Sequence, residues 1–304
     1  MPALSKLTYG TAQLGMAYGV ANRTGRPNVS QVMNILAKAV EAGITCLDSS
    51  PVYGESERLV GLFLKENPGS FAVASKLPYL GKHKPLDGPT LKSMVEEAVR
   101  ASLEMMGVPS LDYYLIHAET DYSLHGDHLF DALHDCREKG LIGQFGLSAY
   151  SPALALKAIS EGAEVLQVPC NLFDQRWVDS GVLGKAEEAD VTVFTRSTYL
   201  QGLIFLPKQE LKQWFPEAAP FVSLLHRTSD KYDIPVAELA FCWVRDLMGV
   251  DSLVVGMETC EQLKENLSLL TKPELDDDVK LQLASHFSNV PVKIINPSLW
   301  PERL

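Results

Sequence analysis

The sequence predicts one closed parallel (β/α)8 barrel. Short apolar runs alternate with amphipathic helical patterns from one end of the chain to the other, and eight such runs occur. No change of composition and no linker divides the chain. A barrel of this kind takes about 250 residues, so the 304 residues are sufficient. We therefore expect residues 1–304 to form a single domain.

The predicted strands are compact and rich in Val, Ile, Leu, Phe or Tyr. Such runs are typical of parallel strands that are buried on both faces. The eight strands are expected at Leu7–Gln13, Thr45–Ser49, Phe71–Lys76, Leu111–His117, Ile142–Ser148, Val165–Pro169, Val191–Arg196 and Ser252–Gly256.

The connections between these runs carry helical patterns. Ser30 can cap the first helix, which is expected to run to Ala42. Two segments are additional to the strands and helices of a minimal (β/α)8 barrel. They are Leu206–Lys231 in the seventh connection and a C-terminal helix near Asp277–Phe287. A doubly wound sheet is the alternative architecture, but the G-x-G-x-x-G motif usual after its first strand is absent.

The composition excludes several classes of partner. Lys and Arg total 27 against 38 Asp and Glu, which gives a net charge of −11. This balance argues against binding to nucleic acid or to an anionic membrane surface, but it permits a small anionic ligand in a local positive pocket. No apolar run has the length of a membrane span.

The cysteines and the N-terminus favour a cytoplasmic protein. The N-terminus lacks the basic-then-apolar pattern of a signal peptide. The five cysteines are scattered and form no C-x-x-C pair, so reduced thiols are expected rather than disulfides. No cluster of His, Cys or carboxylates has metal-ligand spacing, and we expect no metal.

Four titratable side chains are expected at one rim of the barrel. Asp48 lies at the end of the second strand, and Tyr53 follows in the next loop. Lys76 ends the third strand and His117 the fourth. Catalytic groups of such barrels sit at the carboxyl ends of the strands, so these four side chains are the candidate catalytic set.

These residue types together suit the reduction of a carbonyl group. A phenol with its ordinary pKa near 10 is a poor acid, but a neighbouring ammonium is expected to lower that pKa. A carboxylate holds the ammonium in place, and a neutral imidazole polarises the carbonyl oxygen. The phenol then protonates that oxygen while a hydride reaches the carbon, which requires a hydride donor.

The chain resembles the aldo-keto reductases. Seven stretches carry the resemblance in order, each at a predicted strand end: Asp48–Gly54, Ser75–Lys76, Leu115–His117, Gly140–Ser148, Leu166–Asn171, Arg196–Ser197 with Gln201–Leu203, and Val255–Gly256 with Glu261–Asn266. The resemblance implies a metal-independent oxidoreductase that reduces an aldehyde or ketone with a nicotinamide cofactor.

The resemblance also implies roles for particular residues. Tyr53 would donate the proton, Lys76 would tune it, Asp48 would pair with Lys76, and His117 would orient the carbonyl. The implied cofactor-binding residues are Gly10, Thr11, Asp48, Ser148, Gln167, Arg196, Ser197, Gln201, Gly202, Gly256, Gln262 and Asn266. The phosphates are expected near the helix that begins around Thr259. NADP(H) is favoured, with NAD(H) as the alternative.

The sequence departs from the family pattern in three respects. Ala149 stands where the family usually has Asn, so one carboxamide contact is missing. Arg196 stands where many members have a Tyr that stacks on the nicotinamide, and its charge is expected to favour the neutral reduced form. Gly256 and Gln262 replace residues that are often basic at the adenosine 2′-phosphate, with Glu258 between them.

Several interpretations stay open at this point. Trp177 and Tyr199 are expected beside Tyr53 and His117 in the substrate pocket, although Trp177 equally suits packing. Gln262 suits helix capping as well as cofactor contact. The alternative function is a nucleotide-binding regulatory or redox-sensing subunit with little turnover, and a second is a hydrolase or lyase.

The substrate itself is expected to be a small carbonyl compound. The stretch Arg196–Gly202 resembles a bacterial branch sometimes found among sugar-modifying genes, which hints at a sugar-derived carbonyl. No pattern in the sequence specifies the oligomeric state.

Overall fold

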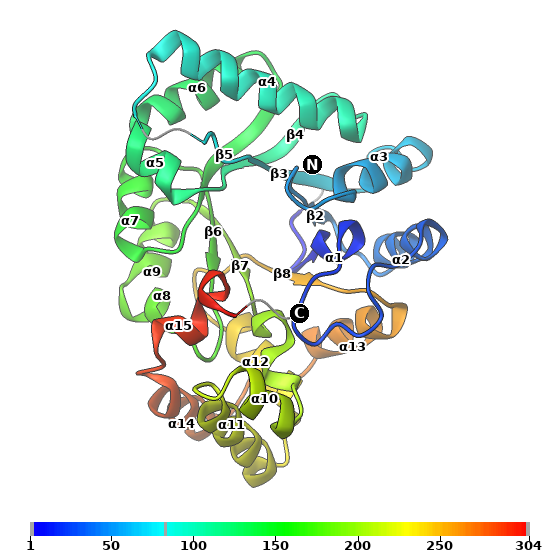
Figure 1. Ribbon diagram of the computed structural model, residues 1–304, viewed down its shortest axis with the longest axis vertical. Coiled ribbons are helices and arrows are strands. Elements are labelled where there is room, and N and C mark those ends of the chain that lie inside the picture. Colours follow the sequence, from blue (N-terminus) through cyan, green and yellow to red (C-terminus); the bar gives the residue numbers. More distant parts are fainter. Residues whose placement is uncertain (1–2, 82–83, 302–304) are drawn as a thin grey trace.

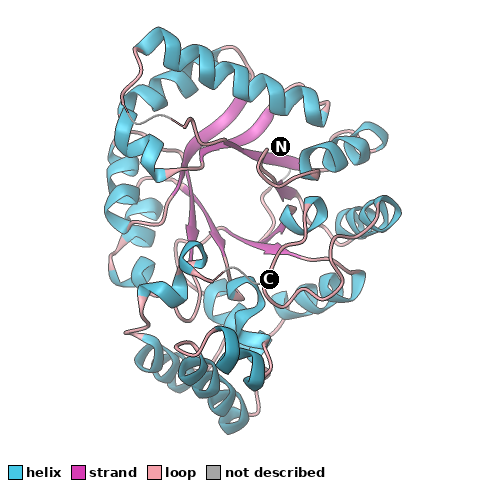
Figure 2. Ribbon diagram, viewed as in Figure 1, coloured by secondary structure: helices cyan, strands magenta, loops and turns pink. Residues whose placement is uncertain are grey.

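Eight parallel strands close into a ring in chain order. The computed structural model describes residues 3–81 and 84–301. Each strand pairs with the next, and the last pairs with the first, so the barrel is closed (Figures 1 and 2). The strands are β1 (Leu7–Gly10), β2 (Cys46–Asp48), β3 (Ala72–Leu77), β4 (Leu111–Ile116), β5 (Ile142–Ser148), β6 (Val165–Pro169), β7 (Thr192–Arg196) and β8 (Ser252–Gly256).

Helices surround this ring, and their caps follow the local sequence. They are α1 (Ala12–Gly15), α2 (Val29–Glu41), α3 (Ser56–Glu66), α4 (Gly88–Met106), α5 (Glu119–His125), α6 (Asp127–Glu138), α7 (Pro152–Ser160), α8 (Arg176–Asp179), α9 (Val182–Glu188), the 3-10 helix η1 (Leu200–Phe205), α10 (Lys208–Trp214), α11 (Ala219–Tyr232), α12 (Val236–Arg245), α13 (Cys260–Leu270), α14 (Asp277–Phe287), α15 (Val292–Ile295) and η2 (Pro297–Leu299).

Two local predictions are wrong in detail. The first strand ends at Gly10 rather than Gln13, because Thr11 leaves the extended conformation, with φ of −97° and ψ of 1°, and precedes α1 as its N-cap. The residues that follow form α1 instead. The cap of α2 is Asn28, not Ser30, since Asn28 and Gln31 exchange side chain to backbone hydrogen bonds in a capping box.

The two segments beyond a bare barrel are confirmed. The seventh connection holds η1, α10, α11 and α12 between β7 and β8, and α14 spans the predicted Asp277–Phe287. Helices α11 and α14 pack against each other at one end of the molecule (Figure 1). Within the described residues, no helix combines the length and apolar character needed to cross a membrane.

The strand pleat directs the site residues inward. Cys46, Ala74, Leu115 and Phe194 pack together in a buried cluster that is separate from the larger core under the helices. Side chains two positions apart in a strand share a face. Because Asp48, Lys76, His117 and Arg196 each lie two residues after a member of this cluster, they continue the inward face at the carboxyl end.

Close packing of β5 against β6 generates a stability prediction. A Cβ atom at Gly146 would lie 1.7 Å from the carbonyl oxygen of Val165, so an added methyl must separate the two strands. We expect Gly146→Ala to lower the free energy of unfolding by about 1–3 kcal/mol, measured by urea denaturation.

The matched control for this change is Gly184→Ala. Gly184 lies within α9, and a Cβ atom there would meet nothing within 4 Å. Alanine is the better helix former, so this variant is expected to be about 0.5–1 kcal/mol more stable than the parent. Equal effects of the two substitutions would contradict the prediction.

Candidate active site

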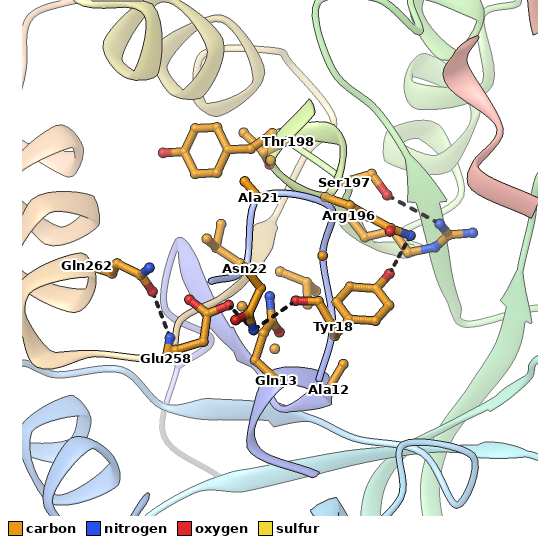
Figure 3. Close-up of a pocket in the computed structure, with 18 of the residues that line it drawn as sticks. Ala12, Gln13, Tyr18, Ala21, Asn22, Arg196, Ser197, Thr198, Glu258 and Gln262 are labelled. Carbon is orange, nitrogen blue, oxygen red and sulfur yellow. Dashed lines mark hydrogen bonds between the residues drawn. The ribbon is translucent and has the colours of Figure 1, made fainter. Parts of the chain in front are cut away.

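A cavity of about 640 Å³ opens at the carboxyl ends of the strands. Asp48, Tyr53, His117 and Arg196 line one part of it, and the loop after β8 with the start of α13 lines another. In Figure 3, Arg196 and Glu258 lie on opposite sides, and the loop that carries Asn22 passes between them. We call the part lined by Asp48, Tyr53, His117 and Arg196 the reacting side of the cavity. The part lined by the loop after β8 and the start of α13 is the far side.

A buried ion pair organises the reacting side. The Lys76 ammonium donates to Asp48 Oδ1 at 2.6 Å and to the Ser49 carbonyl at 2.9 Å, and the Lys76 side chain has no exposed surface. Gln167 Nε2 donates to the same Asp48 oxygen at 2.7 Å. Burial lowers the pKa of Lys76, and the Asp48 carboxylate opposes that change.

Tyr53 lies with its ring against this ion pair. The Lys76 nitrogen is 5.0 Å from the centroid of the Tyr53 ring. Burial, followed by the charge of Asp48, raises the pKa of the phenol, while Arg196 opposes the rise. The expectation of a phenol made acidic by Lys76 is therefore wrong, because burial and the Asp48 carboxylate both raise the pKa of Tyr53. Tyr53 stays protonated, which is the form that a proton donor requires.

His117 completes this group as a neutral imidazole. Burial, with the positive charges of Lys76 and Arg196, lowers the pKa of His117 to about 3. Its ring meets the Tyr53 ring edge-on, with centroids 6.0 Å apart. Ser50 Oγ lies 3.4 Å from His117 Nδ1. Sequence reasoning missed this contact, although Ser50 lies within the stretch that contains Asp48 and Tyr53.

Two buried polar atoms beside Asp48 have no partner among the described residues. They are Ser148 Oγ and Gln167 Oε1, which the register of β5 and β6 places side by side. A donor and an acceptor left unpaired in this way suit a carboxamide group, which offers both. Neither residue belongs to the described lining of the cavity, but Asp48, to which Gln167 donates, does.

All of the other expected cofactor-binding residues line the cavity. These are Gly10, Thr11, Arg196, Ser197, Gln201, Gly202, Gly256, Gln262 and Asn266. Gln262 also has the capping role considered above: its backbone N–H donates to Thr259 Oγ1, and its side-chain oxygen accepts from the Glu258 N–H at 2.7 Å.

The two aromatic residues expected in the substrate pocket differ in position. Tyr199 lines the cavity, but its hydroxyl donates to Asn266 at 2.7 Å, on the far side. Trp177 is fully buried in the main core and is not among the described lining residues. Packing under the helices therefore accounts for Trp177.

A loop after α1 crosses the cavity and was not anticipated. Tyr18 and Asn22 on this loop line the cavity. Asn22 Nδ2 donates to Glu258 Oε1 at 3.3 Å, and Gln201 Nε2 donates to the Tyr18 hydroxyl at 3.0 Å. Arg23 forms an ion pair with Glu210. An irregular loop has no hydrophobic periodicity, so its position across the cavity could not be predicted from the sequence.

Arg196 stacks on a tyrosine of this protein. Its Cζ atom lies 4.3 Å from the centroid of the Tyr150 ring, and Nη1 donates to Ser197 Oγ at 3.4 Å. Among the described residues, no carboxylate forms an ion pair with Arg196. Tyr150 was also missed, since it follows β5 with no motif of its own.

Comparisons with known proteins agree with this architecture. A solved structure, the aldo-keto reductase AKR11C1 from Bacillus halodurans in its holo form, has a TM-score of 0.76 at 20% identity over 96% of both chains. The uncharacterized oxidoreductase YqkF of Bacillus subtilis is 24% identical, over 84% of this chain and 88% of its own. The L-glyceraldehyde 3-phosphate reductase of Escherichia coli O157:H7 is 23% identical to this chain, over 90% of this chain and 89% of its own length.

The family model gives the assignment. The model of the aldo/keto reductase family matches residues 6–286, which is nearly the whole chain. Enzymes of this family are oxidoreductases that use NAD(P)H. The protein is therefore an enzyme and belongs to the aldo/keto reductase family.

Proposed function

We propose that the protein reduces an aldehyde or ketone to an alcohol, with Tyr53 as the proton donor. The observation that carries the proposal is a protonated phenol, a neutral imidazole and a buried Lys76–Asp48 ion pair at one end of a single cavity. The relative named L-glyceraldehyde 3-phosphate reductase acts on an aldehyde, which supports this reaction class.

Tyr53, Lys76 and Asp48 have separate roles in the proposed reduction. Ser148 and Gln167 would hold the carboxamide of a dihydronicotinamide, which would supply the hydride for the carbonyl carbon. Tyr53 gives its phenolic proton to the carbonyl oxygen, so that no free alkoxide forms. The phenolate left behind takes a proton back from solvent, and the Lys76 nitrogen lies 5.0 Å from the centroid of its ring. Asp48 and the Ser49 carbonyl hold that ammonium against the Tyr53 ring.

His117 orients the substrate without exchanging a proton. Ser50 can donate to His117 Nδ1, which leaves the proton of the neutral ring on Nε2. That N–H can donate to the carbonyl oxygen and polarise it. A neutral donor is suited to this task, because an imidazolium would compete with Tyr53 for the role of acid.

The far side of the cavity fits the rest of the dinucleotide. Helix α13 begins at Cys260 beside the cavity, and a helix N-terminus attracts phosphate groups. Glu258 precedes that helix and lines the same side with Glu265. A carboxylate suits a free ribose hydroxyl and repels a 2′-phosphate. We infer that Glu258 weakens the NADP(H) preference that the family resemblance suggests.

Removal of the Tyr53 hydroxyl tests the proton donor. We expect Tyr53→Phe to lower kcat for a panel of aldehydes by about 10²–10⁴-fold, while coenzyme binding, followed by quenching of tryptophan fluorescence, stays within about threefold. Tyr150→Phe is the control, since it removes a phenol from the same cavity but keeps the ring under Arg196. Full turnover by Tyr53→Phe rejects the assignment.

Absence of turnover in the parent protein would have a different meaning. If the parent binds the coenzyme but reduces no member of the panel, the regulatory alternative is favoured instead.

The low pKa of His117 predicts a pH dependence of stability. Its folded pKa of about 3 lies below the ordinary value of 6.5, so between these values the unfolded chain binds the extra proton. This residue therefore leaves stability unchanged above pH 7 and lowers it as the pH falls below 6.5, by up to about 1.4 kcal/mol per pH unit.

His117→Gln removes this contribution. The difference in unfolding free energy between parent and variant, measured by urea denaturation from pH 8 to pH 5, should be flat above pH 7 and shift against the parent below 6.5. A constant difference over the whole range would show that His117 is not held neutral.

Reversal of the charge at Glu258 tests the coenzyme preference. We expect Glu258→Arg to lower the Kd for NADPH relative to that for NADH by at least about tenfold, equivalent to about 1.4 kcal/mol, measured by fluorescence titration. Glu261→Arg makes the same charge change on an exposed position of α13 outside the described cavity lining. An equal shift in both variants would contradict a local role of Glu258.

A further inference from the structure

Arg196 lines the reacting side of the cavity, where its polar support is weak. Its guanidinium donates to Ser197 Oγ at 3.4 Å, near the upper limit for a hydrogen bond. A long charged side chain keeps many rotamers unless another group packs against it. The Tyr150 ring provides such a surface, with its centroid 4.3 Å from Arg196 Cζ. Tyr150 is therefore the platform that limits where the Arg196 charge lies.

The register of β6 and β7 places this charge close to the carboxamide site described above. Gln167 pairs with Phe194, and Pro169 pairs with Arg196. Arg196 thus lies two residues beyond the level of Gln167, on the same inward face of the barrel. A nicotinamide whose carboxamide is held by Ser148 Oγ and Gln167 Oε1 would therefore be within reach of the Arg196 charge.

The backbone of Tyr150 is held by a carboxylate from the neighbouring connection. Ala149 is still bonded to β6, since its N–H donates to the Gln167 carbonyl at 2.8 Å. The next two N–H groups, of Tyr150 and Ser151, donate to Glu119 Oε1 at 2.7 and 2.6 Å. Hydrogen bonds to a carboxylate are shorter and stronger than those between neutral groups. The side chain of Glu119 therefore fixes the turn that carries the Tyr150 ring.

Glu119 itself lies on a well-anchored helix. It is the first residue of α5, two residues after His117 in the connection that follows β4. Tyr122 of the same helix is fully buried in the main core. Asp121 accepts the Leu80 N–H at 2.9 Å, which ties α5 to the connection after β3. An acceptor on this helix can therefore hold the neighbouring loop in a fixed position.

We propose that Glu119 is a positioning residue for the coenzyme, because through Tyr150 it holds the Arg196 guanidinium beside the nicotinamide site. The charge held there opposes the cationic oxidised ring but not the neutral reduced ring. This inference rests on the proposed function and adds to it a residue outside the described lining of the cavity. Glu119 touches neither coenzyme nor substrate in this role, and no bond forms or breaks at it.

A purely structural role of Glu119 has a different consequence. Ser151 is the N-cap of α7, and Glu119 accepts the N–H of that residue at the start of the helix. If Glu119 serves only this helix, its loss lowers stability and weakens the binding of both coenzyme forms alike. A role through Arg196 instead changes the ratio of the two Kd values, because only the oxidised form carries a charge on its nicotinamide ring.

The ratio of the Kd for oxidised coenzyme to the Kd for reduced coenzyme tests the proposal. Quenching of tryptophan fluorescence measures both values, with the coenzyme pair, NAD(H) or NADP(H), that the parent binds more tightly. We expect Arg196→Gln to lower the ratio about tenfold, equivalent to about 1.4 kcal/mol. Glu119→Leu should lower it by at least about threefold, the factor that a cation–π contact supplies. In the Arg196→Gln background, Glu119→Leu should change the ratio no further.

A conservative variant and a control separate the hydrogen bonds of Glu119 from its charge. Glu119→Gln keeps an acceptor oxygen at the same reach, so its ratio should stay within about twofold of the parent. Glu66→Leu is the control, since it removes a carboxylate from an exposed position of α3 outside the described cavity lining. It should leave both Kd values unchanged. Thermal midpoints establish which variants fold.

A second route covers the case in which Glu119→Leu does not fold. Tyr150→Leu removes the platform itself and leaves the two backbone N–H groups on Glu119 in place. Its ratio should also fall by at least about threefold. Glu119→Asp keeps the charge but shortens the reach of the acceptor, so its ratio should fall below that of Glu119→Gln.

The outcomes distinguish this inference from the proposed function. An unchanged ratio in Glu119→Leu or in Tyr150→Leu overturns the inference, and so does an equal fall in Glu119→Gln and Glu119→Leu, because charge alone would then explain it. Each of these results leaves carbonyl reduction through Tyr53 in place, since aldehyde turnover is measured separately. Failure of the parent to bind any nicotinamide coenzyme overturns both.

Discussion

The buried ion pair between Lys76 and Asp48 is the interaction on which the arrangement of the site depends. Burying two charges is costly unless each is fully paired, and removing one partner from such a pair destabilises a protein by about 3–5 kcal/mol. Here the Ser49 carbonyl and the Gln167 amide complete the pairing, so strands β2, β3 and β6 are tied at one level. The same network sets the environment of Tyr53 and His117.

The electrostatics of the reacting side follow from that network. Burial and the Asp48 carboxylate raise the pKa of Tyr53, so its phenol stays protonated in the free protein, and burial with the charges of Lys76 and Arg196 lowers the pKa of His117, so its ring stays neutral. Each group is thereby held in the protonation state that carbonyl reduction requires before substrate arrives.

The barrel and the inward positions of Asp48 and Lys76 could be predicted because strand pleat and the (β/α)8 pattern follow directly from apolar periodicity. The length of the first strand could not be predicted, because a short apolar run is compatible with both a strand and a turn of helix. The burial of Trp177 and the pKa of Tyr53 depend on neighbours that are distant in the chain. The sequence shows that these residues are present, but it does not show which distant residues surround them in the fold.

The loop across the cavity has a consequence for the order of events. Tyr18 of this loop contacts Gln201, and Arg23 contacts Glu210, both in the connection between β7 and β8. Asn22 contacts Glu258, which follows β8. A long dinucleotide cannot slide beneath a segment held at three points unless those fastenings release together. Opening of this loop would therefore be a step of coenzyme exchange that is separate from the chemistry.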